Sequence, residues 1–143
     1  MKNHFAAAVI LVAFSMKVVA GECYKNSHKV LDARTNAFVT VTDSLEVKSR
    51  TKDAIEFSLV TLGPNFHQCQ VEGKAVRKEA YFEYVDSLPG EVCRLRISFP
   101  DSQAHVLDPD YYPCHKYCGA RGNIHLRNDG KTFQRASGDS CES

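Results

Sequence analysis

The chain has 143 residues, with 18 Lys and Arg against 17 Asp and Glu, and a formal net charge of +1. This length suits one domain with a core of its own, and the composition excludes a disordered tail, a coiled coil and a collagen. A net charge so close to zero argues against a protein built to neutralise phosphates, so we expect no nucleic-acid partner.

The first twenty residues predict a signal peptide. Lys2 precedes an uncharged apolar run at residues 5–14, and the small residues Val19 and Ala20 follow. The run is too short to span a bilayer, which takes about 20 apolar residues. We therefore predict cleavage after Ala20, no membrane span, a periplasmic or secreted protein, and a single β-rich domain over residues 21–143.

The body of the chain predicts β-strands. A helix is possible within residues 24–37, where the pattern is ambiguous. The short segments beyond residue 37 alternate between apolar and polar residues. The clearest is Cys93–Phe99, and the others are Phe38–Val41, Leu45–Val47, Ile55–Leu59, Tyr81–Val85, His105–Leu107 and Ile124–Leu126. Turn-forming residues such as Gly63-Pro64 and Pro89-Gly90 separate them. This pattern predicts an all-β fold, a small antiparallel β-barrel or sandwich.

All six cysteines fall in the predicted mature chain: Cys23, Cys69, Cys93, Cys114, Cys118 and Cys141. An even number in a small exported domain indicates three disulfides. Zinc is the competing interpretation at Cys114 and Cys118, with His115 or His125 as a further ligand. Covalent haem is excluded because Gly119, and not His, follows Cys118. We favour disulfides and expect no metal and no cofactor.

The sequence offers little for catalysis. A cysteine nucleophile needs an unpaired thiol, and an even count leaves none. A hydrolase could use a pair of carboxylates, but the candidates are spread along one strand and its turn: Glu79, Glu83, Asp86 and Glu91. We interpret these carboxylates as solvated and predict that the protein is not an enzyme.

His67 has two interpretations. It shares a face with Cys69 if both lie on one strand, and it could then be a contact residue at the mouth of a barrel. We favour the alternative, in which His67 is buried and hydrogen-bonded to the backbone beside a disulfide. Asn65, which follows Gly63-Pro64, could close a turn by bonding its own backbone.

Charge is unevenly distributed along the chain. Residues 114–135 carry a local charge of +4, whereas residues 101–110 carry −3. A basic patch beside Tyr111, Tyr112 and Tyr117 could meet an acidic partner, since Tyr and Arg often supply binding energy at interfaces. The same charges could equally be the solvated faces of strands.

Three spaced motifs carry a resemblance to a known family. They are Asn65-x-His67-x-Cys69-x-x-x-Gly73-x-Ala75, Cys93-x-Leu95 and Cys114-x-x-x-Cys118-Gly119-Ala120-Arg121. Together they resemble a pattern in small exported bacterial proteins, which broadly resemble the membrane-bound and periplasmic lysozyme inhibitors. The resemblance implies a disulfide-tied β-barrel that binds a protein. Cys23 and Cys141 lie outside the motifs, near the ends of the mature chain, and we expect them to pair.

The resemblance does not transfer inhibitory residues, because Cys141 stands where those inhibitors have the Tyr of a Ser-Gly-x-x-Tyr-like loop. An inhibitor of a hydrolase with acidic catalytic residues would still need a basic side chain. We therefore predict Lys116 and Arg121 as binding residues, with Tyr112 or Tyr117 at the rim.

Two functions follow from the sequence. The first is an exported binding or inhibitory protein directed at a lysozyme-like cell-wall hydrolase. Its target could also be a toxin delivered to the periplasm, in which case it would act as an immunity protein. The second is a barrel that binds a small ligand or an envelope glycan, in a cavity lined by Phe57, Leu59, Phe82 and Leu95.

Overall fold

The computed structural model describes residues 19–86, 89–110, 113–119, 124, 129–137 and 141, with side chains from Gly21 onward. Most of the predicted signal peptide, residues 1–18, lies outside this range, and so do the predicted binding residues Tyr112 and Arg121. The predicted cleavage point after Ala20 falls within the first strand.

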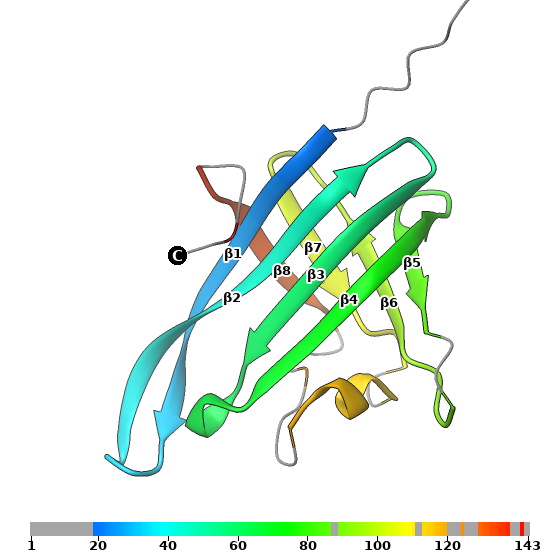
Figure 1. Ribbon diagram of the computed structural model, residues 1–143. Coiled ribbons are helices and arrows are strands. Elements are labelled where there is room, and N and C mark those ends of the chain that lie inside the picture. Colours follow the sequence, from blue (N-terminus) through cyan, green and yellow to red (C-terminus); the bar gives the residue numbers. More distant parts are fainter. Residues whose placement is uncertain are drawn as a thin grey trace, which may run out of the picture.

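Eight strands form one closed barrel in which every neighbouring pair is antiparallel (Figure 1). They are β1 (Val19–Asp32), β2 (Ala37–Arg50), β3 (Ala54–Leu62), β4 (Gln68–Arg77), β5 (Phe82–Val85), β6 (Arg94–Ser98), β7 (Gln103–Leu107) and β8 (Lys131–Arg135). Two 3-10 turns complete the described chain, η1 (Pro64–Phe66) and η2 (Pro113–Tyr117). The all-β prediction is confirmed, and the closure of β8 on β1 makes the fold a barrel.

Every second side chain along the strands points into the barrel and fills it. In β6, Leu95 and Ile97 are fully buried while Arg94 and Arg96 lie half-buried on the other face, as the sequence predicts. The core combines inward side chains from all eight strands, and its largest fully buried members are Phe57, Phe133, Leu45, Ile55, Leu59, Leu95 and Ile97. A barrel of eight strands has an interior that its own side chains can fill or that can hold one small ligand. Here the buried side chains fill it.

The β1–β2 hairpin is longer than the barrel. The two strands pair from Val19 with Arg50 as far as Asp32 with Ala37, but β3 joins β2 only from Ser44 onward. On its other side, β1 pairs with β8 only at Tyr24 and Lys25. The hairpin therefore extends past the other strands at the end of the barrel where η1 and η2 lie (Figure 1).

The helix that the sequence allowed within residues 24–37 does not form. Its residues form most of β1 and the turn at residues 33–36. The pattern there is hard to interpret because β1 faces the core, the solvent and η1 in different parts of its length. The predicted segments Phe38–Val41 and Leu45–Val47 likewise belong to one strand, β2.

Two further strands were not predicted, β4 and β8, and both pair with strands on either side. The predicted strand Ile124–Leu126 is described only at Ile124, which is buried, and its remaining residues lie outside the described range.

All six cysteines form disulfides: Cys23–Cys141, Cys69–Cys118 and Cys93–Cys114. The disulfide interpretation and the pairing of Cys23 with Cys141 are confirmed. Zinc at Cys114 and Cys118 is wrong, because both sulfurs are bonded to other cysteines. In the part of the chain that is described, no helix has the length and hydropathy needed to cross a membrane.

Candidate functional site

The tip of the β1–β2 hairpin carries exposed apolar side chains. Leu31 and Phe38 are cross-strand partners, and 36% of Leu31 and 70% of Phe38 is accessible to solvent. The turn between them, residues 33–36, contains no Gly or Pro, and Asn36 adopts the left-handed conformation with φ of 53°. An apolar pair on a projecting turn is more typical of a contact surface than of a core.

The turn η1 packs against this tip. The Asn65 side-chain carbonyl accepts a hydrogen bond of 2.6 Å from the backbone N–H of Ala33. The prediction that Asn65 closes a turn on its own backbone is therefore wrong, since its oxygen binds a residue 32 positions away. Asn65 and Phe66 both adopt left-handed backbone, with φ of 56° and 59°. For a bulky residue such as Phe66 this conformation costs on the order of 1–3 kcal/mol.

The hairpin tip and η1 together border a hollow of about 630 Å³ that is open to solvent, here called the tip pocket and lined by Ala33, Arg34, Asn65, Phe66 and His67. Arg34 lies on the rim with 82% of its side chain accessible, and its Nε is 3.4 Å from the Asp32 carboxylate. The hydrogen bond from the Arg34 backbone N–H lowers the pKa of Asp32. The pocket thus combines an aromatic wall, an amide, an imidazole and a guanidinium.

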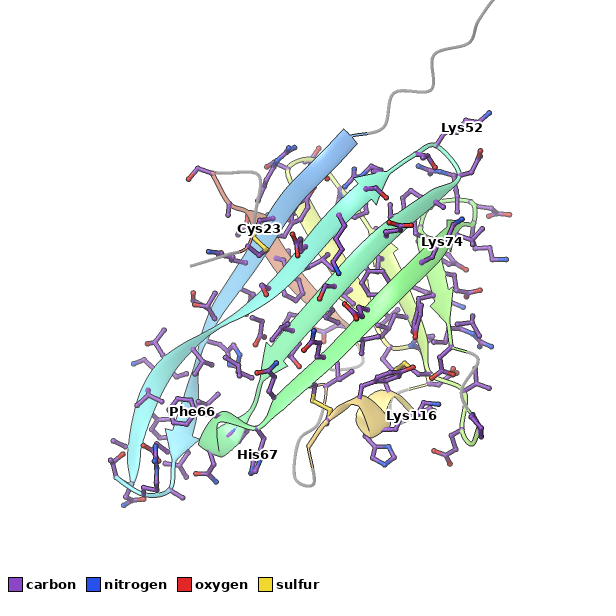
Figure 2. The ribbon with its side chains drawn as sticks, in the orientation of Figure 1. Cys23, Lys52, Phe66, His67, Lys74 and Lys116 are labelled. Carbon is purple, nitrogen blue, oxygen red and sulfur yellow. A yellow bond between two sulfur atoms is a disulfide. The ribbon has the colours of Figure 1, made fainter. Side chains whose placement is uncertain are left out.

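His67 lies at the edge of this pocket, directly before β4 (Figure 2). Its side chain is half-buried, whereas its backbone holds η1 through a 2.8 Å bond from the Gly63 N–H to the His67 carbonyl. The favoured interpretation of His67 as a buried histidine on the strand of Cys69 is therefore wrong. The alternative interpretation of His67, a contact residue at one end of the barrel, stays a prediction.

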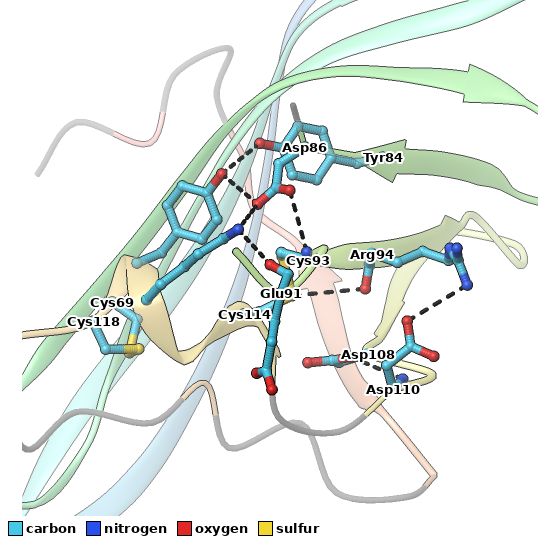
Figure 3. The surroundings of a disulfide bond; sticks show 12 residues. Cys69, Tyr84, Asp86, Glu91, Cys93, Arg94, Asp108, Asp110, Cys114 and Cys118 are labelled. Atoms are coloured by element: carbon cyan, nitrogen blue, oxygen red, sulfur yellow. Dashed lines mark hydrogen bonds and ion pairs between the residues drawn. A yellow bond between two sulfur atoms is a disulfide. The ribbon is translucent and has the colours of Figure 1, made fainter. Parts of the chain in front are cut away.

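The predicted binding residues Lys116 and Tyr117 lie elsewhere, on η2, where they surround the buried Asp86 (Figure 3). The Lys116 Nζ is 2.7 Å from the Asp86 Oδ2 and donates a 2.6 Å hydrogen bond to the Glu91 carbonyl. The Tyr117 hydroxyl donates to the same Oδ2 at 2.9 Å, and the Cys93 N–H donates to Oδ1 at 3.3 Å. In the free protein these side chains bind Asp86.

Tyr84 extends this cluster from β5, with its hydroxyl 3.0 Å from that of Tyr117. Because Tyr117 gives its single proton to Asp86, Tyr84 donates to Tyr117. Burial would raise the pKa of Asp86, but the hydrogen bonds from Lys116 and Tyr117 outweigh it and hold that pKa below its ordinary value. Burial, and then the hydrogen bonds with Tyr84 and Asp86, raise the pKa of Tyr117.

The basic segment, residues 114–135, is neutralised where it is described. Besides Lys116, Lys131 pairs with the fully buried Asp43, and an Arg135 Nη lies 3.6 Å from the Glu22 carboxylate. In the acidic stretch, Asp110 is 3.5 Å from the Arg94 guanidinium. Among the described residues, the basic side chains of the basic segment, Lys116, Lys131 and Arg135, are therefore paired with acidic groups within the protein.

No protein-family model, curated protein or solved structure matches this chain. We therefore infer the chemistry of the site from its geometry alone. Every cysteine sulfur is held in a disulfide, which removes the cysteine nucleophile as an option. Among the described residues, no group of three or more His, Cys, Asp or Glu side chains could hold a metal ion.

Sequence reasoning found one residue of the tip pocket, His67, and missed Arg34 and Phe66. The signal for Phe66 was present in the run Gly63-Pro64-Asn65, since Asn tolerates left-handed backbone and marks a sharp turn. Arg34 carried no signal, because only the fold brings residues 33–34 of the hairpin against residues 65–67.

Proposed function

We propose that this protein is an exported, disulfide-stabilised binding protein that acts by contact with another protein. Its target is a lysozyme-like cell-wall hydrolase or a toxin delivered to the periplasm. The observation that carries the proposal is the tip of the β1–β2 hairpin, where exposed apolar side chains and a strained loop project from a barrel tied by three disulfides.

A preformed, rigid contact surface supports binding because little conformational entropy is lost in the complex. The hairpin is paired along its whole length, and η1 is joined to it through Asn65 and Ala33. The aromatic Phe38 and Phe66 are among the residue types enriched at protein interfaces. Three disulfides fit an oxidising compartment outside the cytoplasm.

The alternative, a barrel with a ligand cavity, is less well supported. The four residues that would line such a cavity, Phe57, Leu59, Phe82 and Leu95, are at most 3% accessible and belong to one packed cluster. Phe57 contacts the ring of Tyr84 edge-on at 5.5 Å between centroids, and Phe82 contacts Phe99 at 6.0 Å. Side chains occupy the interior where a ligand would bind.

The test uses the mature chain in two measurements. Turbidity assays with lysozymes of several classes measure inhibition, and capture from envelope extracts followed by mass spectrometry identifies a hydrolase or toxin. We expect wild-type protein to inhibit or capture such a target, and Phe38→Ser to bind it at least about tenfold more weakly. If the wild-type protein inhibits no lysozyme and captures no hydrolase or toxin, the proposal is refuted.

A further inference from the structure

We infer that the tip pocket is the recognition site of this protein and that it accepts a carboxylate side chain, Asp or Glu, from an acidic loop of the partner. The inference rests on the proposed function in one respect only, that the partner is a protein.

The first step is the conformation of Phe66. Its left-handed backbone, with φ of 59°, is costly for a residue with a large side chain. Burial of the ring does not offset this cost in the free protein, because 43% of Phe66 is accessible to solvent. A partner that covers the ring would supply the missing burial.

The second step is the chemistry of the rim. Arg34 contacts Asp32 through Nε, which leaves the edge formed by Nη1 and Nη2 for a planar acceptor. A carboxylate fits that edge with two parallel hydrogen bonds, the geometry in which Arg binds most strongly. His67 and the amide of Asn65 add polar groups to the same pocket.

The third step is charge. The tip, residues 29–40, contains Lys29 and Arg34 against one carboxylate, Asp32, and η1 contains no acidic residue. Asp32 is buried and already accepts hydrogen bonds from Arg34. The surface around the pocket is therefore net basic, and it complements an acidic loop and repels a basic one.

A second hollow of about 420 Å³ on the outer face of β2, β3 and β4 shows the contrast. Its charged lining residues are two lysines and two glutamates, Lys48, Lys74, Glu56 and Glu72, and the Lys48 Nζ is 3.1 Å from the Glu72 carboxylate. These charges cancel, so this hollow favours neither an acidic nor a basic partner.

A peptide titration tests the pocket directly. The probe is acetyl-Leu-Glu-Leu-amide added to ¹⁵N-labelled mature protein, with acetyl-Leu-Gln-Leu-amide as the matched neutral peptide. We expect amide shifts at Ala33, Arg34, Phe66 and His67, with the Glu peptide at least fivefold tighter than the Gln peptide. Equal affinities, or shifts confined to another part of the barrel, would overturn the inference. Chitooligosaccharides and anionic vesicles are the competing probes. If either one displaces the Glu peptide from the pocket at a concentration below that of the peptide, the inference that the partner is a protein is overturned.

Three variants separate recognition from folding. Phe66→Gly removes the ring and the backbone strain together, so thermal stability stays equal or rises while affinity for the Glu peptide falls at least fivefold. Arg34→Gln abolishes the preference for Glu over Gln. Lys52→Gln removes the same charge at the opposite end of the barrel and leaves the preference unchanged (Figure 2). A loss in Lys52→Gln equal to that in Arg34→Gln would show a general charge effect and refute the pocket.

The same variants separate this inference from the proposed function. If wild-type protein captures a hydrolase or toxin and Phe66→Gly and Arg34→Gln capture it equally well, the pocket fails and the function stands. If no such target is found but the Glu peptide binds as expected, the function fails and the pocket stands.

Discussion

At the scale of single residues, Gly73 of β4 is a position of very close packing. It lies opposite Phe57, and the ring of Tyr84 from β5 packs against its Cα. A Cβ at this position would lie 2.6 Å from the Tyr84 Cε2, a distance that side chains cannot tolerate. Since Tyr84 is buried and bonded to Tyr117, its ring has little freedom to move away.

Gly73→Ala should therefore destabilise the protein by about 1–3 kcal/mol, the usual cost of overpacking a core. Urea denaturation measures the change. Gly119→Ala is the matched control, because no atom lies within 4 Å of a Cβ at that position. Equal stability of the two variants would contradict the close approach of Tyr84 to Gly73.

Asp86 gives the protein a pH-dependent contribution. Its pKa is lower in the folded chain than in the unfolded chain, so the folded state binds fewer protons. The stability that Asp86 contributes is fully present above its ordinary pKa of about 3.9, and it is lost as the pH falls through the lowered value.

Asp86→Asn should destabilise the protein by about 2 kcal/mol at pH 7, because the ion pair with Lys116 is lost. The gap between wild type and variant should narrow below about pH 4, where the wild-type carboxyl becomes protonated. Urea midpoints between pH 7 and pH 2 measure this. Asp53→Asn, at an exposed turn, is the control, and a gap that stays constant into acid would contradict the prediction.

At the scale of elements, the disulfides attach segments that lack strand pairing. Cys114 and Cys118 hold the two ends of η2 to Cys93 before β6 and to Cys69 in β4. This matters because β4 and β5 pair at only two positions, Val76 with Glu83 and Arg77 with Phe82. Cys118, directly after η2, is bonded to Cys69 of β4, and Tyr117 of η2 is hydrogen-bonded to Tyr84 of β5, so this segment links the two strands.

The three disulfides should differ in their contribution to stability according to loop length. Cys23–Cys141 spans 118 residues and Cys93–Cys114 spans 21. In the chain-entropy account, removing them should cost about 5 and about 3 kcal/mol respectively. Denaturation of C23A/C141A and C93A/C114A measures both, and a larger loss in the second variant would contradict that account.

At the scale of the whole molecule, the barrel depends on its covalent links. The three disulfides together contribute on the order of 10 kcal/mol, which is comparable to the total stability of a domain of this size. Reduction of the mature protein should therefore abolish its β-sheet circular dichroism at 37 °C. Thiol titration should find no free thiol before reduction and six after it, and a native spectrum with six free thiols would contradict the prediction.

Much of the fold could be predicted because its signals are local. Alternation in Cys93–Phe99 and Ile55–Leu59 identified β6 and β3, since each strand buries one face. The candidate site could not be predicted in the same way. The tip pocket joins Arg34 to Phe66, and Lys116 binds Asp86, and in both cases the partners are far apart in the sequence.

The sequence by itself determined the all-β class and the use of all six cysteines in disulfides, and it suggested the pairing of Cys23 with Cys141 that the structure has. These depend on periodicity, on cysteine number and on position in the chain. Only the tertiary structure decided the closure of the barrel, the projection of the β1–β2 hairpin and the pairing of the described basic side chains of residues 114–135 with acidic groups. The physical reason is that burial and charge pairing depend on which distant side chains meet: Asp43 neutralises Lys131, and the fold exposes Phe38.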